Sequence, residues 1–168
     1  MIHVCSLAAL PSTVKDTGAS HVLTVMANVA QVQRPASVLP ANHLKVQMDD
    51  ITEAAEGFIA PSDHHIEQVL NFVRVWNRNA PLVVHCYAGI SRSTASAFAA
   101  ACMLNPDRDE RDIARRIRAA SPIASPNRLL VTLADKALGR DGRMVRALDE
   151  MGPGSMTVTG KPFRIDLD

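Results

Sequence analysis

The sequence predicts an α/β fold with a central, mostly parallel sheet of about four to five strands that is flanked by helices. Two observations lead to this prediction. Short apolar or alternating runs, typical of strands, alternate along the chain with longer amphipathic segments, typical of helices. In addition, the apolar run Leu82-Val83-Val84 is followed by a tight segment containing Gly89 and then by an alanine-rich stretch, residues 93–104, that has no Gly or Pro.

The size and composition indicate one ordinary globular domain. The 168 residues are enough for a single substantial core, with 47% apolar and 21% charged residues. The net charge of +1 gives no reason to expect nucleic acid or an anionic membrane as a partner, and no apolar run approaches the roughly 18 residues of a membrane span. Three scattered cysteines and the absence of a basic leader lead us to expect a cytoplasmic protein without a cofactor.

The first part of the chain is expected to supply three strands and one short helix. Their order is strand 2–7, helix 12–17, strand 21–26 and strand 43–48. Gly18 ends the helix, and the last of these strands is indicated by alternating polarity. Residues 27–42 contain Pro35 and Pro40 with little periodicity, and are therefore expected to form a loop.

The second part is expected to be mostly helical around one strand. The predicted elements are helix 62–77, strand 81–85, helix 93–104, a helix from Pro106 to Ser121, helix 128–139 and a short helix 141–150. Gly152-Pro153-Gly154 breaks the last helix. We therefore expect a single domain, residues 1–154, and a C-terminal tail, residues 155–168. The sequence does not decide whether this tail packs on the domain or serves a partner.

The segment between strand 81–85 and the alanine-rich helix has the features of an anion cradle. Loop N–H groups converge there, and the N-terminus of the following helix adds its positive dipole end. Cys86 opens this loop and Arg92 closes it. A helix N-terminus and a nearby arginine favour the thiolate, which is the nucleophilic form of cysteine, and a guanidinium fork matches two phosphoryl oxygens. A nucleophile inside such a cradle indicates a phosphatase.

The residues around this cradle also carry a family resemblance. His85-Cys86-(five residues)-Arg92-Ser93, with Gly89 in the middle, resembles the signature of the cysteine-dependent protein tyrosine phosphatase superfamily, in a compact, dual-specificity-like bacterial form. The resemblance implies a phosphate-binding loop between strand and helix, formed by Tyr87, Ala88, Gly89, Ile90, Ser91 and Arg92.

The same resemblance implies roles for individual side chains. Cys86 would form a phosphocysteine intermediate, and Arg92 would hold the phosphoryl oxygens. Ser93 would hydrogen-bond the Cys86 sulfur and ease its departure when water attacks. His85 would support the backbone of the loop rather than accept a proton from the substrate.

A carboxyl group is expected near Cys86. Strands 43–48 and 81–85 are joined through helix 62–77 as one crossover unit, so they are parallel and end at the same edge of the sheet. Asp49 and Asp50 follow the first strand, and Cys86 follows the second. The resemblance implies that an aspartate in this position protonates the leaving oxygen and later takes a proton from water. Asp50, which precedes Ile51, is favoured, and Asp49 is the alternative.

Two smaller features, Asn127 and the His64-His65 pair, bear on the predicted site. In the resembling family an asparagine before the last helices braces the phosphate-binding loop, and Asn127 is in the corresponding place. A simple helix cap is an equally good explanation of Asn127. His64 and His65 lack a third ligand at any recognisable spacing, so no metal is expected.

Together these observations predict a metal-independent phosphomonoester hydrolase, with a phosphorylated protein or peptide as substrate and phosphotyrosine as the first choice. The loop 87–91 contains no Lys or Arg, which argues against a highly charged inositol phosphate. Two alternatives use the same cradle: a rhodanese-like sulfurtransferase, and a module that binds phosphorylated residues without turnover. The presence of Cys86, Arg92 and an aspartate favours the phosphatase. The sequence does not decide between phosphotyrosine and phosphoserine or phosphothreonine, nor the oligomeric state, for which a monomer is our expectation.

Overall fold

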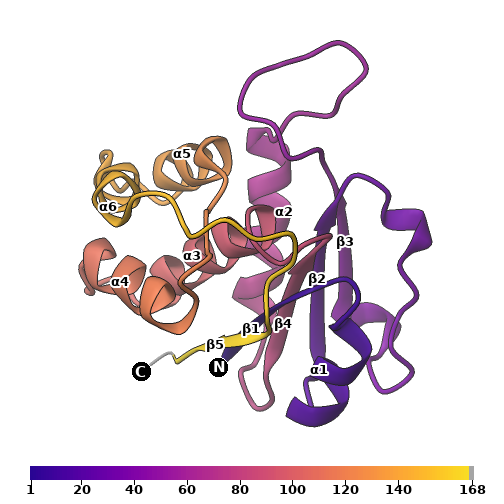
Figure 1. The fold of residues 1–168 in the computed structure, drawn as a ribbon. Coiled ribbons are helices and arrows are strands. Elements are labelled where there is room, and N and C mark those ends of the chain that lie inside the picture. Colours follow the sequence, from indigo (N-terminus) through magenta and orange to yellow (C-terminus); the bar gives the residue numbers. More distant parts are fainter. Residues whose placement is uncertain (167–168) are drawn as a thin grey trace.

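A five-stranded sheet runs through the middle of the computed structural model, which describes residues 1–166 (Figure 1). The strands lie in the order β3-β2-β4-β1-β5, and all except β5 are parallel. Their bounds are β1 (Ile2–Ser6), β2 (His21–Met26), β3 (His43–Gln47), β4 (Leu82–Cys86) and β5 (Phe163–Ile165). The predicted fold class, a mostly parallel sheet flanked by helices, is confirmed.

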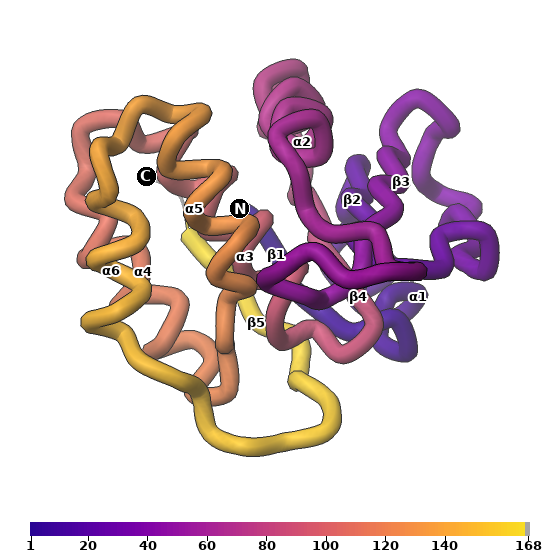
Figure 2. Tube along the Cα trace, turned by 90° about the horizontal axis from the view of Figure 1, so that it is seen from above, coloured from indigo at the N-terminus to yellow at the C-terminus, as the bar shows by residue number. Residues whose placement is uncertain are grey.

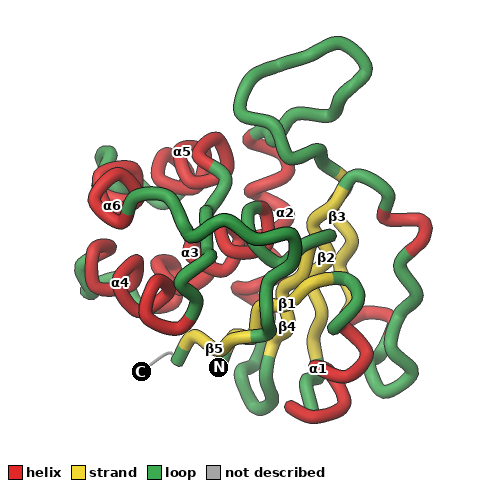
Figure 3. Tube along the Cα trace, viewed as in Figure 1, coloured by secondary structure: helices red, strands yellow, loops and turns green. Residues whose placement is uncertain are grey.

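The helices cover the two faces of the sheet unequally (Figures 2 and 3). They are α1 (Leu10–Thr17), α2 (Asp63–Val75), α3 (Arg92–Leu104), α4 (Glu110–Ala120), α5 (Arg128–Ala137) and α6 (Arg143–Met151). Helix α1 packs on one face, whereas α2 and α3 pack on the other, and α4, α5 and α6 form an outer layer against α3. In the described part of the chain, no helix is both long and apolar enough to cross a membrane.

Alternation along the strands divides the core between these faces. In β4, Val83 belongs to the apolar cluster beneath α1, whereas Leu82, Val84 and Cys86 belong to the larger cluster beneath α2 and α3. This is the period of two expected for a strand. The Cys86 side chain therefore lies on the face of the sheet that α3, the next helix in the chain, covers.

Several elements differ from their predicted bounds for local reasons. The loop 27–42 contains two short 3₁₀ turns, η1 (Val29–Gln31) and η2 (Pro40–Asn42). The helix predicted to open at Pro106 begins at Glu110, because the Asp109 side chain caps it by accepting a hydrogen bond from the Arg111 N–H at 2.8 Å. The segment expected to form a C-terminal tail contributes β5, which pairs antiparallel with β1.

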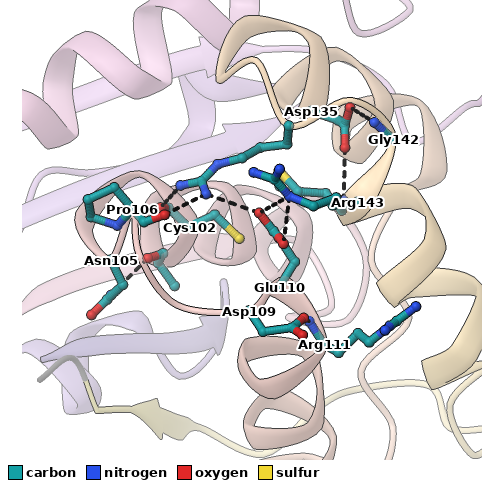
Figure 4. Close-up of polar contacts among 12 residues, drawn as sticks. Cys102, Asn105, Pro106, Asp109, Glu110, Arg111, Asp135, Gly142 and Arg143 are labelled. Atoms are coloured by element: carbon teal, nitrogen blue, oxygen red, sulfur yellow. Dashed lines mark hydrogen bonds and ion pairs between the residues drawn. The ribbon is translucent and has the colours of Figure 1, made fainter.

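A buried ion cluster joins α4 to α6 (Figure 4). The Glu110 side chain is only 3% exposed, and it accepts hydrogen bonds from Arg140 Nη1 at 3.0 Å and from Arg143 Nε at 3.2 Å. Arg140 also donates to the carbonyl oxygens of Cys102 at 2.6 Å and Pro106 at 2.8 Å. These bonds fix the outer helical layer to the C-terminal end of α3.

Candidate active site

The Cys86 loop, residues 86–92, lies between the end of β4 and the start of α3. Cys86 is 2% exposed, and its Sγ lies 3.1 Å from Ser93 Oγ and accepts a hydrogen bond from the Gly89 N–H at 3.3 Å. Gly89 has φ of +73°, and a Cβ there would lie 2.7 Å from main-chain atoms of Cys5 and Ser6. The turn therefore requires glycine both for its backbone angle and for its packing on β1.

The carbonyl groups of this loop are held from outside. Each of four carbonyl oxygens accepts a hydrogen bond from a backbone N–H of another segment: Tyr87 O from Leu7 at 3.1 Å, Ala88 O from Gly160 at 2.8 Å, Ile90 O from Ser125 at 3.0 Å and Ser91 O from Asn127 at 3.3 Å. Holding the carbonyls outward leaves the loop N–H groups available for an anion on the inner side. The loop is thus shaped by three different parts of the chain, around Leu7, Ser125–Asn127 and Gly160.

Arg92, the first residue of α3, closes the loop from a buried position. It is 8% exposed, and its Nη1 donates to the Met48 carbonyl at 2.9 Å. Its Nε has no hydrogen-bond partner among the described residues, and lies 3.8 Å from Asp50 Oδ2. An unpaired buried donor costs about 1–3 kcal/mol, so a ligand oxygen is the expected partner for Nε.

The structure brings Asp50, rather than Asp49, to the Cys86 loop. Asp50 Oδ1 accepts hydrogen bonds from Ser91 Oγ at 2.7 Å and from Asn127 Nδ2 at 2.8 Å. Asp49 Oδ2 accepts from the Ile59 N–H at 2.7 Å, at the base of the long loop between β3 and α2. The two neighbouring carboxylates thus have different partners, one in the site and one within its own loop.

Asn127 is both a helix cap and a brace within the site. Its Oδ1 accepts from the Leu130 N–H at 3.0 Å, which makes it the cap of α5. Its Nδ2 donates to Asp50 and, at 3.2 Å, to the Ile51 carbonyl. The side chain therefore braces the loop that carries Asp50, while the Asn127 main-chain N–H is the part that contacts the Cys86 loop at Ser91.

His85 lies fully buried beneath the Cys86 loop. Its Nε2 is 2.7 Å from Thr24 Oγ1, which is also 2.8 Å from His43 Nε2. Burial lowers the pKa of His85 to about 4, so its ring is neutral near pH 7. A neutral, enclosed imidazole fits a supporting role better than that of a base.

The other two cysteines are separated from Cys86. Cys5 lies opposite His85 in the β1–β4 register, so its side chain lies on the other face of the sheet from that of Cys86. Burial raises the pKa of Cys5 to about 12 and also raises that of Cys102. Both thiols therefore stay protonated and unreactive. Within residues 1–166 there is no group of three His, Cys, Asp or Glu side chains that could hold a metal ion.

Sequence reasoning missed several contributors to the site. Thr24, the Met48 carbonyl, Ser125 and Gly160 all contact residues at or next to the Cys86 loop. The three backbone contributors carry no side-chain signal, and the Thr24 contact depends on the pairing of β2 with β4.

Comparisons with known proteins agree with this arrangement. The family model described as protein-tyrosine phosphatase matches residues 44–122, a range that contains both Asp50 and the Cys86 loop. Dual specificity protein phosphatase 15 from Homo sapiens is 34% identical over 86 residues, which cover 51% of this chain and 27% of that protein. The match thus spans about a quarter of the length of this curated relative.

Solved structures of dual-specificity and related phosphatases share the fold. The crystal structure of DUSP15 has a TM-score of 0.65 and 20% identity, covering 92% of this chain and 94% of that one. The human tyrosine phosphatase-like serine/threonine/tyrosine-interacting protein has a TM-score of 0.64 and 16% identity, covering 83% and 92%. The PTP-2 phosphatase of Cydia pomonella has a TM-score of 0.62 and 20% identity, covering 80% and 84%.

These likenesses extend over the sheet, the helices and the segment that holds the His85-Cys86 pair, Arg92 and Ser93. The chain is therefore similar to the protein-tyrosine phosphatase family over residues 44–122 and shares the fold of solved dual-specificity phosphatases.

Proposed function

We propose that this protein hydrolyses phosphomonoesters on proteins or peptides through a phosphocysteine intermediate. The observation that carries the proposal is the Cys86 sulfur, which lies within hydrogen-bonding distance of Gly89 N–H and Ser93 Oγ. Its loop is closed by Arg92, whose Nε has no hydrogen-bond partner among the described residues. The dual-specificity name of the human relative supports a phosphoprotein substrate. Because a nucleophilic thiol needs reducing conditions, the proposal includes a cytoplasmic location.

In the first step the Cys86 sulfur attacks phosphorus in line with the leaving oxygen. The S–P bond forms as the P–O bond breaks, and Asp50 transfers its proton to the departing oxygen. Main-chain N–H groups of residues 87–92 and the Arg92 guanidinium bind the three equatorial oxygens while negative charge builds on them. The alcohol or phenol product then leaves.

In the second step water hydrolyses the intermediate. The Asp50 carboxylate takes a proton from the water, whose oxygen attacks phosphorus as the S–P bond breaks. Inorganic phosphate is released, and Cys86 leaves as a thiolate that accepts hydrogen bonds from Ser93 and Gly89. Asp50 serves as acid and then as base because hydrogen bonds from Ser91 Oγ and Asn127 Nδ2 hold its carboxyl group in one place.

An aromatic phosphomonoester is proposed as the first substrate to test, because an aromatic ring is exposed in the Cys86 loop itself. Tyr87 is 69% exposed there. Exposed aromatic rings of this kind offer apolar contact to a peptide. Phosphotyrosine peptides are therefore proposed first, and phosphoserine and phosphothreonine peptides are the comparison.

The decisive experiment measures hydrolysis of para-nitrophenyl phosphate and of a phosphotyrosine peptide, with EDTA and reductant present. We expect turnover by the wild type and none by Cys86→Ser. Asp50→Asn should lower kcat on the peptide by about 10²-fold, because it removes the proton donor. The loss on para-nitrophenyl phosphate should be smaller, since its leaving group needs less protonation.

Asp49→Asn is the matched control, one residue away, and should change kcat less than about threefold because this carboxylate bonds within its own loop. The reverse ranking of the two variants would move the acid to Asp49. Phosphopeptide binding without turnover would identify a binding module, and thiocyanate formation from thiosulfate and cyanide would identify a sulfurtransferase.

A further inference from the structure

The C-terminal segment leaves α6 and crosses the molecule to β5, as the yellow path in Figure 1 shows. It is fixed before and after the crossing. Near its start, the Gly154 N–H donates to Ser125 Oγ at 2.9 Å, and the Ser155 N–H donates to the Pro122 carbonyl at 3.0 Å. At its end, Phe163 and Ile165 are buried and pair with β1. The intervening residues 155–159 are exposed.

Gly160 is the buried point between these anchors, and it contacts the Cys86 loop. Its N–H donates to the Ala88 carbonyl at 2.8 Å. A Cβ on Gly160 would lie 3.0 Å from Gly89 O and 3.3 Å from Ala88 O, which is closer than ordinary van der Waals contact. Its φ is not in the left-handed region, so glycine serves here for close approach rather than for backbone conformation.

The contact acts on a particular peptide group. The Ala88 carbonyl and the Gly89 N–H belong to the same planar, trans peptide unit, in which C=O and N–H point in opposite directions. Gly160 holds the carbonyl end from outside, while the N–H end donates to Cys86 Sγ at 3.3 Å on the inside. Rotation of this unit would turn the N–H away from the sulfur and from a bound phosphate.

We propose that residues 152–165 form a strap that fixes the Cys86 loop, and that Gly160 is a positioning residue for anion binding by that loop. This inference rests on the proposed function, since it assigns the strap to the same site. The strap aims the Gly89 N–H at the reacting centre. None of the groups in the strap takes part in bond making or proton transfer.

Gly160→Ala tests the strap with a single methyl group. We expect the inhibition constant of inorganic phosphate to rise about three- to tenfold, the range of one weakened hydrogen bond. We also expect amide hydrogen exchange at Gly89 to become faster, because this N–H loses its fixed direction. The second readout does not depend on turnover.

Gly139→Ala is the matched control. It lies just after α5, outside the strap and the Cys86 loop, and its φ of +62° makes a methyl group there strained. We expect it to lower the melting temperature at least as much as Gly160→Ala, while the inhibition constant of phosphate and the exchange rate at Gly89 stay within twofold of wild type. The proposed strap would be wrong if the two variants raised the inhibition constant of phosphate equally. It would also be wrong if Gly160→Ala changed neither that constant nor the exchange rate at Gly89.

The readouts also separate this inference from the proposed function. If the wild type binds phosphate without turning over substrate, phosphate affinity by calorimetry replaces the inhibition constant and the comparison stands. If the wild type neither binds phosphate nor hydrolyses esters, the proposed function fails, and Gly89 exchange alone decides whether Gly160 holds the loop.

Discussion

Two arginines are almost equally buried in this molecule, Arg92 at 8% and Arg140 at 6% exposure, but their hydrogen bonding differs. Arg140 donates to two carbonyl oxygens and to the carboxylate of Glu110. Arg92 donates to the Met48 carbonyl and leaves its Nε without a hydrogen-bond partner among residues 1–166. A satisfied buried arginine is part of the architecture, whereas an unsatisfied one indicates where a ligand is needed.

The presence of a surface hollow beside an arginine would lead to the opposite choice, and it is a poorer guide. A hollow of about 440 Å³ lies beside Arg140 and Arg143, lined also by Arg146 and residues 106–111, and none of its lining residues belongs to the Cys86 loop. A phosphoryl group is small, and a loop of N–H groups can bind it without a large cavity. The unpaired donor, rather than the volume, marks the chemistry.

The largest effect expected from this comparison is on activity, in Arg92→Lys. Lysine keeps the charge but loses the planar fork and the Nε donor, so we expect kcat/KM on para-nitrophenyl phosphate to fall about 10³-fold. The free energy of unfolding should change by less than about 1 kcal/mol. Steady-state kinetics and urea unfolding measure the two quantities. A loss of stability with activity retained would make Arg92 another structural arginine.

Arg140→Met should show the converse. Removing this guanidinium leaves two buried carbonyls and part of Glu110 without their donor, so the free energy of unfolding should fall by about 3–5 kcal/mol, while kcat of the folded protein stays unchanged. Arg146→Met, on the exposed side of the same hollow, is the control and should cost less than about 0.5 kcal/mol. Comparable urea midpoints for the two variants would contradict the structural role assigned to Arg140.

The smallest expected effect concerns His85, which is buried like the arginines but neutral. Its folded pKa of about 4 lies below the unfolded value of 6.5, because burial opposes charging. The unfolded chain therefore binds the extra proton first, and stability falls as the pH drops from 6.5 to 4, by at most about 1.4 kcal/mol per pH unit. His43 shifts in the same direction. Urea unfolding between pH 4 and 6.5 should show that the free energy of unfolding depends less steeply on pH in His85→Gln than in the wild type. An unchanged dependence would mean that His85 does not cause the loss of stability at low pH.

The sequence was sufficient for the parts of the site that have local signals. The apolar run of β4, the turn at Gly89 and the alanine-rich α3 each have a pattern of their own, and they follow one another directly. Crossover geometry also predicted that the strand before Asp50 and the strand before Cys86 would end at the same edge, and both strands are parallel in the observed sheet.

What the sequence could not provide depends on which strands are neighbours. Strand β2 lies between β3 and β4, and only this order places Thr24 between His43 and His85. The bonds to Ala88 and Ile90 come from main-chain N–H groups, whose positions no residue type reveals. Strand β5 has three residues, which is too short for its alternation to indicate a strand.

Strand β5 also protects the edge of the sheet from pairing with a second copy of the protein. Strand β1 is largely buried and apolar, and without β5 its open backbone would be a template for pairing with a second chain. In β5 the exposed edge is only three residues long, is preceded by Pro162, and carries Arg164 in an ion pair with Asp166. The opposite edge, β3, exposes Lys45. Cutting the chain before β5 should therefore promote edge-to-edge aggregation in addition to loosening the Cys86 loop, whereas a methyl group on Gly160 leaves both edges protected.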